Sequence, residues 1–363
     1  MLLDVLECPR CRGALRAGGD GLVCAACVQT YPRLGGIPLL VAEPATLFAH
    51  FSALTREFDA GMNRGLLELL AQIRSGDHPP LTQQKLEILR RQLERHWRRI
   101  LELVTDAGLE AAVYEVPDNA ASPASKAALL QYYPQIHRDW GWSPENDEAA
   151  EALRAVNDVV AERPLGKMLV LGAGACRLTQ DLHCRHGATL TVALDLNPLP
   201  FFVAQRLLRG ESVSLFEFPA WPLDSKHPYV ERHLVSPWPA DPRIELLFAD
   251  GLNPPVRAGT FDTIFTPWFI DHVPSDMRTL FARLWELLPV GGRWVNFGPL
   301  IYREERTPLE HRYCVDEVLE LVREAGFRIE RYSFRRMGYM QSPASTQGRT
   351  ETVLTFSAER LAG

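Results

Sequence analysis

The spacing of hydrophobic residues changes along the chain and divides it into regions of different character. In "LEILRRQLERHWRRILELV" apolar residues recur every three or four positions, which predicts an amphipathic helix with one buried stripe. The stripe consists of Leu86, Leu89, Leu93, Trp97, Ile100 and Val104. Helical spacing extends over residues 44–165, where "HPP" and "ASPAS" mark breaks between helices. We expect a helical region here, with an arginine-rich face of a kind that is more often solvated than bound to nucleic acid.

Residues 166–363 instead alternate short apolar runs with helical patterns, which predicts an α/β fold. The expected architecture is a Rossmann-like parallel sheet with helices on both faces. The strand-like runs are "KMLVL", "ATLTVALDLN", "RIELLFAD", "FDTIFTPW" and "GGRWVNFG". A proline- and tryptophan-rich insertion, residues 219–242, separates two of the strands. Its length is compatible either with a lid over a site or with a rigid surface excursion.

Composition narrows the classes of partner and location. The 363 residues are 46% hydrophobic and carry a net charge of −6. The negative charge argues against binding to nucleic acid that is driven mainly by electrostatics. No run of eighteen apolar residues could span a bilayer, and the first residues lack the pattern of a secretion signal. We therefore expect a cytoplasmic protein without membrane contact. The pattern does not determine its oligomeric state.

Four of the seven cysteines form two C-x2-C pairs near the start of the chain. Such pairs suit a tetrahedral Zn²⁺ site, and the ligands would be Cys8, Cys11, Cys24 and Cys27. Protein thiolates would fill all four positions, so the zinc would be structural; two disulfides or chance are the alternatives. With "YP" and "GIPLL", residues 1–43 resemble the zinc-ribbon family that activates tRNA and protein methyltransferases as a partner subunit.

A glycine turn follows the first predicted strand, and acids end the next two. Gly172 and Gly174 would let the backbone approach a ligand, Asp195 could bind both ribose hydroxyls, and Asp250 could reach an adenine amino group. The third glycine of the dinucleotide fingerprint is missing, because Cys176 and Arg177 stand there, and this disfavours NAD. S-adenosylmethionine carries an adenosine without phosphate and fits better. The alternative is that both acids only terminate turns.

Four motifs in order, "GAGACRL", "FADG", "FTPWFIDH" and "WVNFGPLIY", resemble the carnosine N-methyltransferase family. The helical lead-in "LLQYYPQIHRDWGW" and a C-terminal hairpin of "RIERYSF" with "TETVLTFSAE" also fit, so the resemblance covers about residues 126–358. It implies a class I methyltransferase that uses S-adenosylmethionine to methylate nitrogen of an imidazole- or amine-containing small molecule or peptide.

The resemblance also implies roles for individual residues. Asp271 would orient the acceptor nitrogen, Tyr302 is the second catalytic candidate, and Arg177 would approach the methionyl carboxylate of the cofactor. The substrate-binding candidates are Trp268, Phe269, His272, Arg303 and Tyr339. The simpler alternatives are that Asp271 caps a helix, that His272 only lines or caps, and that the aromatic residues belong to the core.

Two departures from the family bear on the acceptor. The chain has Arg303 where the family has histidine, and Gly348, Arg349 and Thr350 where it has a tyrosine cluster. Guanidinium groups replace imidazole and aromatic contacts, which disfavours carnosine itself and favours an acceptor with a carboxylate or phosphate. The rival functions are an RNA base methyltransferase with the ribbon as recognition domain, and a non-catalytic S-adenosylmethionine-binding scaffold.

Overall fold

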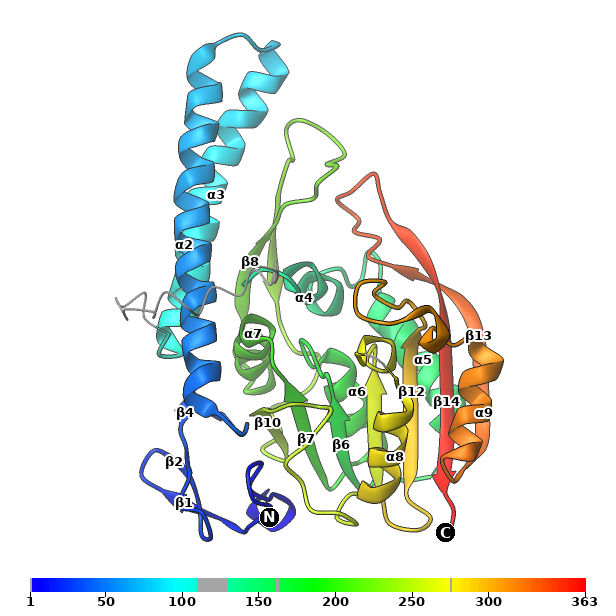
Figure 1. Cartoon of the computed structure of the whole chain (residues 1–363). Helices are drawn as coiled ribbons and strands as arrows, with labels where there is room; N and C mark the ends of the chain where they lie inside the picture. The colour runs from blue at the N-terminus through cyan, green and yellow to red at the C-terminus, as the bar shows by residue number, and fades with distance from the viewer. Residues whose placement is uncertain (1, 110–128, 161–162, 275) are drawn as a thin grey trace.

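A seven-stranded sheet forms the centre of the computed structural model, which describes residues 2–109, 129–160, 163–274 and 276–363. Its order is β10-β7-β6-β11-β12-β14-β13; the first five strands are parallel, and β14 runs antiparallel to both neighbours (Figure 1). The strands are β6 (Lys167–Leu171), β7 (Leu190–Asp195), β10 (Ile244–Phe248), β11 (Thr263–Pro267), β12 (Arg293–Pro299), β13 (Phe327–Tyr339) and β14 (Arg349–Arg360). This doubly wound order and the final hairpin confirm the Rossmann-like α/β fold.

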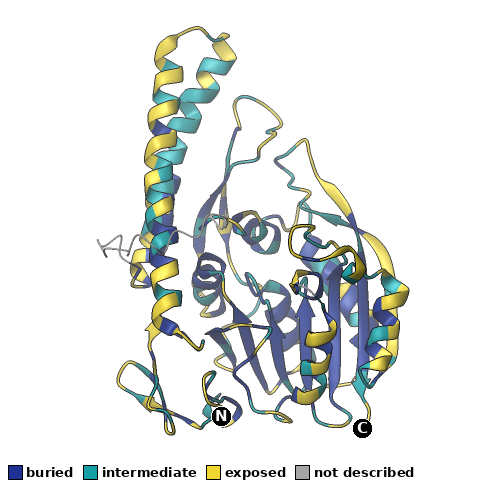
Figure 2. Cartoon of the chain, in the orientation of Figure 1, coloured by how far each residue is buried: buried dark blue, intermediate teal, exposed yellow. Residues whose placement is uncertain are grey.

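Both faces of the sheet are covered, which is why its central strands are apolar throughout. In β6 the alternate residues Met168 and Val170 face one core cluster, whereas Leu169 and Leu171 face the other. The first cluster contains residues of α5 (Glu148–Val160), α6 (Arg177–His186) and α7 (Pro198–Leu208). The second contains residues of α8 (Arg278–Leu287) and α9 (Val315–Glu324). Figure 2 shows the central strands as buried between these layers.

The N-terminal ribbon covers the edge of the sheet at β10. It contains α1 (Leu2–Val5), β1 (Leu15–Gly18), β2 (Gly21–Cys24), β3 (Thr30–Tyr31), β4 (Arg33–Leu34) and β5 (Ile37–Pro38). Leu39 bridges Phe248 in parallel, and the Leu40 amide donates a hydrogen bond of 2.8 Å to the Phe248 carbonyl. These bonds use backbone groups that an edge strand would otherwise leave unpaired.

Two long helices, α2 (Pro44–Ser75) and α3 (Pro80–Asp106), form an antiparallel hairpin that projects beyond the sheet (Figure 1). The predicted break at "HPP" separates them, whereas "ASPAS" lies outside the described residues. Of the predicted α3 stripe, Ile100 and Val104 are buried against the body and the other four residues are half-buried. Figure 2 shows the outer part of the hairpin as a mixture of exposed and intermediate residues.

The rest of the helical region packs against the sheet. α4 (Tyr133–Trp140) contacts α6 and α7, and α5 contacts β13 and β14. No helix within the described ranges is long and apolar enough to cross a membrane.

A small antiparallel pair lies outside the main sheet: β8 (Val213–Glu217) precedes the insertion, and β9 (Val230–Leu234) lies within it. The loop between them meets the β13–β14 loop, where Pro222 bridges Ser345 and the Thr346 amide donates 2.9 Å to the Trp221 carbonyl. Two 3-10 turns, η2 (Ile270–His272) and η3 (Leu309–His311), follow β11 and β12.

Candidate active site

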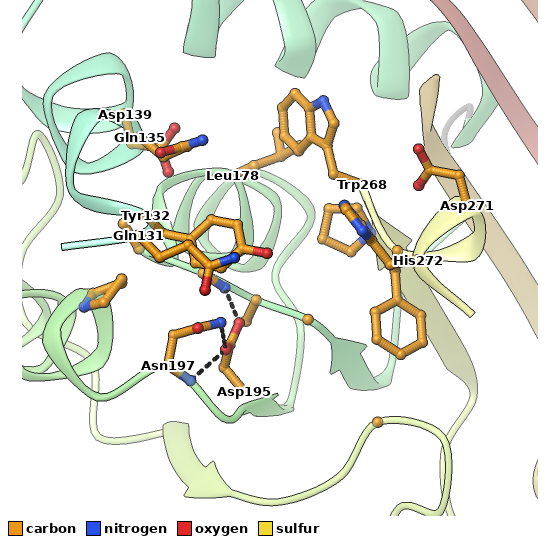
Figure 3. Close-up of a pocket in the computed structure, with 18 of the residues that line it drawn as sticks. Gln131, Tyr132, Gln135, Asp139, Leu178, Asp195, Asn197, Trp268, Asp271 and His272 are labelled. Carbon is orange, nitrogen blue, oxygen red and sulfur yellow. Dashed lines mark hydrogen bonds between the residues drawn. The ribbon is translucent and has the colours of Figure 1, made fainter. Parts of the chain in front are cut away.

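A cavity of about 510 Å³ lies at the carboxyl ends of β6, β7, β10 and β11, where the strand order reverses. Ligands of doubly wound folds bind at this point because the loops diverge there. In the view of Figure 3, Asp195 and Asn197 lie on one side of the cavity and Asp271 on the other, with Trp268 between them. The cavity therefore brings together groups from strands that are distant in sequence.

Asp195 is buried at the end of β7 and held by backbone amides. Its Oδ2 accepts a hydrogen bond of 2.7 Å from Gly174, and its Oδ1 accepts bonds from the amides of Leu196 (2.7 Å) and Asn197 (2.8 Å). Burial raises the pKa of Asp195, against the opposing effect of these donors. A carboxylate oxygen can accept more than one bond, so Oδ2 retains capacity for a ligand hydroxyl.

The two glycines of the turn are required for different reasons. Both have a positive φ, +72° at Gly172 and +55° at Gly174. A Cβ at Gly172 would lie 2.6 Å from the Phe269 ring, so this glycine makes room for an aromatic side chain of the cavity wall. A Cβ at Gly174 would meet no protein atom within 4 Å, which leaves the space beside its backbone open to a ligand.

Asp250 is exposed on the loop that follows β10, where its Oδ1 accepts a bond of 2.9 Å from the Leu252 amide. It lines the same cavity as Gly174 and Asp195. The three groups expected to surround an adenosine thus share one cavity.

Asp271 has a buried oxygen without a partner. The residue is 4% exposed in η2, its Oδ2 accepts a bond of 3.1 Å from the Ile301 amide, and its Oδ1 has no hydrogen-bond partner among the described residues. Burial raises the pKa of Asp271 to about 7. An unpaired buried acceptor is costly, so its presence at a cavity wall points to a donor supplied by a ligand.

The helix-cap interpretation of Asp271 does not describe its contacts. The hydrogen bond that it accepts comes from the segment after β12 and not from the start of a helix. At the start of α8 the Arg278 amide instead donates 3.0 Å to Asp276. The carboxylate of Asp271 therefore joins two loops at the cavity.

Trp268 is held in a left-handed backbone conformation, with φ +46°. A Cβ at Gly298 would lie 3.0 Å from the Trp268 Cα, so glycine is needed beside it. The indole packs edge-on against Phe297, at 4.7 Å between ring centroids, and the Arg138 guanidinium lies 4.2 Å from its centroid. A strained aromatic residue fixed on both sides makes a rigid wall.

The structure distinguishes two arginines near the glycine turn. Arg177 is absent from the cavity lining: its Nε donates 2.8 Å to Asp181 and its Nη1 donates 3.1 Å to the Asp139 carbonyl. Arg138 from α4 lines the cavity, is 8% exposed and pairs with Asp139 at 2.7 Å. Arg138 is thus the buried guanidinium that faces the cavity.

The remaining candidates are divided in the same way. Phe269, His272, Arg303 and Tyr339 line the cavity, as do Trp268 and Asp271. Tyr302 does not; its hydroxyl donates 2.8 Å to the Tyr313 carbonyl. The insertion 219–242 contributes no lining residue.

Sequence reasoning did not assign several lining residues. They come from the segment before and within α4 and from β14: Gln131, Tyr132, Gln135, Arg138, Asp139, Arg349 and Glu351. Arg349 was noticed only as a departure from a family pattern. The aromatic and charged density of "QYYPQIHRD" was the available signal for the α4 group.

The four ribbon cysteines form a cluster that fits a metal. Their Sγ atoms lie within 4.8 Å of one another, with 3.7 Å between Cys8 and Cys27 and 3.5 Å between Cys11 and Cys24. Zn–S bonds of about 2.3 Å in a tetrahedron place sulfur atoms about 3.8 Å apart. All seven cysteines are free, so the disulfide alternative does not hold.

Comparison with known proteins supports the resemblance inferred from the motifs. Residues 236–360 match a family model described as Carnosine N-methyltransferase. Carnosine N-methyltransferase of Mus musculus is 24% identical over 227 residues, which are 54% of this chain and 53% of that protein. The chain thus matches about half the length of this curated relative. The expected resemblance to the carnosine N-methyltransferase family is confirmed over these ranges.

Solved structures with a similar fold include several methyltransferases. Haemonchus contortus phosphoethanolamine N-methyltransferase 2 with S-adenosyl-L-methionine is 14% identical, covers 67% of this chain and 59% of its own, and has a TM-score of 0.41. A SAM-dependent methyltransferase from Methanosarcina mazei is 14% identical, covers 55% and 95%, and has a TM-score of 0.39. The fold assignment rests on the strand order and not on these superpositions.

Proposed function

We propose that this protein is an S-adenosylmethionine-dependent methyltransferase acting on nitrogen of an imidazole- or amine-containing small molecule or peptide. The observation that carries the proposal is the unpaired, buried Oδ1 of Asp271, in the same cavity as Gly174 and Asp195. The match to the carnosine N-methyltransferase family includes the segment that contains Asp271.

The cavity residues fit this cofactor. Asp195 would bind the ribose hydroxyls, Asp250 the adenine amino group, and the open space beside Gly174 would accept the chain of the ligand. Arg138, rather than Arg177, would bind the methionyl carboxylate, because Arg138 lines the cavity beside the glycine turn and Arg177 does not. When bound, S-adenosylmethionine would supply an electrophilic methyl group on a positively charged sulfur.

Asp271 would act on the acceptor. As a carboxylate it can accept a hydrogen bond from the N–H of an imidazole or amine, which fixes the tautomer and aims the lone pair of the reacting nitrogen. Its negative charge would stabilise the positive charge that develops on the acceptor, and its Oδ1 could take the released proton. A carboxyl group whose pKa is raised to about 7 is suited to exchange that proton near neutral pH.

Arg303 would bind an anionic part of the acceptor. It is half-buried at the cavity, and the one hydrogen bond of its side chain among the described residues is a long contact of 3.4 Å with the Tyr132 hydroxyl. It forms no ion pair within the described part of the chain, so its guanidinium group is available to bind a carboxylate or phosphate. Trp268, Phe269, His272 and Tyr339 would complete the wall, and we assign no chemical step to Tyr302.

The zinc ion, held by Cys8, Cys11, Cys24 and Cys27, would be structural, because protein sulfur fills every tetrahedral position. The cluster belongs to the ribbon, which packs along β10. The metal would therefore stabilise the fold without taking part in methyl transfer.

A turnover assay tests the proposed function. The protein is incubated with S-adenosylmethionine and, one at a time, imidazole-containing amino acids, dipeptides and primary amines, and S-adenosylhomocysteine is measured. We expect acceptor-dependent product that is strongly reduced in Asp271→Asn. No acceptor-dependent product with any of these compounds would contradict the proposal.

A further inference from the structure

We propose that Glu351 and Tyr339 form a subsite for a positively charged group of the acceptor, and that Arg349 occupies this subsite until the acceptor displaces it. The subsite would bind an alkylammonium or guanidinium group that lies elsewhere in the acceptor than the reacting nitrogen. The inference rests on the proposed function and specifies the class of acceptor. It concerns the hairpin β13–β14, which forms one wall of the cavity.

Strand register places the three side chains together. Tyr339 pairs with Arg349, and Met337 pairs with Glu351. Directly opposed residues and residues two apart on one strand share a face of a sheet. Tyr339, Arg349 and Glu351 therefore share one face of the hairpin, and all three line the cavity.

Glu351 is a buried acid with incomplete pairing. Its side chain is 3% exposed, and neither oxygen has a hydrogen-bond partner of acceptable geometry among the described residues. Arg349 Nη2 lies 2.6 Å from Oε1 as an ion-pair contact. A buried carboxylate whose one cationic partner makes no well-oriented hydrogen bond is incompletely stabilised, which favours a further cationic donor from the cavity.

Arg349 has the properties of a replaceable occupant. Its side chain is 63% exposed, and its guanidinium lies 4.6 Å from the Tyr339 ring centroid. An aromatic face beside a carboxylate is a receptor for a cation. Because the Arg349 side chain is already largely solvated, its departure from the subsite returns it to water at little cost.

Arg138 is a second cation near this subsite, with its guanidinium 5.4 Å from the Tyr339 ring centroid. Arg138 is already paired with Asp139 at 2.7 Å. Burial and, to a smaller extent, the negative charge of Glu351 raise the pKa of Asp271. The two carboxyl groups therefore face the same cavity closely enough to interact. Displacement of Arg349 would leave Glu351 to an acceptor cation and Asp271 to the reacting nitrogen.

A pair of matched probes tests the subsite. Histamine carries an imidazole and an ammonium group, whereas 4-methylimidazole carries the imidazole alone. Each is titrated calorimetrically at pH 7.5 into the full-length protein saturated with S-adenosylhomocysteine. We expect wild type to bind histamine roughly tenfold or more tightly than 4-methylimidazole, and the ratio to fall to about one in Glu351→Gln.

A second variant tests the occupant. Arg349→Gln should bind histamine roughly threefold or more tightly than wild type, because the competing cation is gone. Glu320→Gln on α9 and Arg336→Gln on β13 remove exposed charges that do not line the cavity and should leave both affinities unchanged. Thermal unfolding and S-adenosylhomocysteine titration check that each variant is folded with an intact cofactor site.

The outcomes separate this inference from the proposed function. No preference of wild type for histamine, including the case in which neither probe binds, overturns the subsite. A preference that survives Glu351→Gln, or histamine binding that weakens in Arg349→Gln, overturns it as well. Failure of S-adenosylhomocysteine to bind at all would instead contradict the proposed cofactor.

Discussion

Asp271 carries a consequence for stability that can be measured without an acceptor. Burial raises its pKa in the folded protein to about 7, whereas an unfolded aspartate has a pKa of about 3.9. Between these values the folded state holds a proton that the unfolded state has lost. The contribution of Asp271 to the free energy of unfolding therefore falls as pH rises through this window, by on the order of a few kcal/mol.

Asp271→Asn removes this titration, so the variant should gain stability relative to wild type as pH rises from 5 to 8. The difference between their melting temperatures, measured at each pH, checks the sign. Asp276→Asn is the control, because the pKa of Asp276 is lowered in the folded protein, despite its partial burial, chiefly by its bonds with Arg278. A difference between Asp271→Asn and wild type that stays constant over this range would contradict the raised pKa.

The same substitution should slow turnover. Asparagine keeps the shape of Asp271 but cannot take a proton or stabilise a developing cation, so we expect the rate to fall roughly a hundredfold, or about 2.7 kcal/mol. Affinity for S-adenosylhomocysteine should be nearly unchanged. Undiminished turnover of Asp271→Asn on the true acceptor would show that the acid serves only to join the two loops.

Substitutions of Arg138 and Arg177 should have different effects on cofactor recognition. If Arg138 binds the methionyl carboxylate, Arg138→Met should reduce the preference for S-adenosylhomocysteine over 5′-methylthioadenosine, which lacks that carboxylate, by roughly tenfold or more. Arg177→Met should leave the preference intact. Equal effects of the two substitutions, measured by calorimetry, would contradict this assignment.

At the scale of elements, the ribbon is attached to the loop that carries Asp250. Arg12 lies beside a ribbon cysteine and bonds to the Asn253 side chain and, at 3.2 Å, to the Pro254 carbonyl. The Glu7 amide donates 3.0 Å to the Pro255 carbonyl. The fold of the ribbon and the position of this loop are therefore physically connected.

Loss of the metal should weaken this contact. Cys24→Ser, or removal of zinc by a chelator, should lower the melting temperature by roughly 5 °C or more, because metal binding stabilises the ribbon that covers β10. Cys314→Ser at an exposed position outside the cluster is the matched control. Metal analysis that finds no zinc in fresh protein, or equal melting of both variants, would contradict a structural zinc.

The sequence predicted elements whose patterns are local and long. The parallel strands and the α3 stripe follow directly from apolar spacing, and the break before Pro80 follows from proline chemistry. β8 and β9 were not predicted, because they are short strands, one just before and one within a proline-rich insertion. Four residues of the stripe are only half-buried because α3 extends beyond the body of the protein. The spacing of apolar residues in the sequence does not reveal how far a helix projects.

The site was predictable where its residues follow strand ends. Asp195 and Asp250 could be found in this way, because parallel strands end at one edge of the sheet. Arg138 and Glu351 could not, since they reach the cavity only through the packing of α4 and the pairing of β13 with β14. The role of Gly172 in accommodating Phe269 likewise required the tertiary contact.

At the scale of the whole molecule, three regions distant in sequence enclose one cavity: the α4 segment, the carboxyl ends of the parallel strands, and the C-terminal hairpin. Asp195 and Asp271 lie on different sides of this cavity (Figure 3), so the proposed function would separate an adenosine side from an acceptor side. The α2–α3 hairpin lies outside the cavity, and three of its arginines, Arg90, Arg95 and Arg99, are paired with glutamates. Ion pairing of these arginines reduces the positive charge that this hairpin could offer to nucleic acid.

The most direct test of the central claim is calorimetric titration of the purified protein with S-adenosylhomocysteine. We predict one site with micromolar affinity, no binding of NAD, and a loss of roughly 1–3 kcal/mol in Asp195→Ala, which removes the acceptor of the ribose hydroxyls. Absence of S-adenosylhomocysteine binding, or equal affinity in wild type and Asp195→Ala, would contradict the assignment of this cavity as a methyltransferase site.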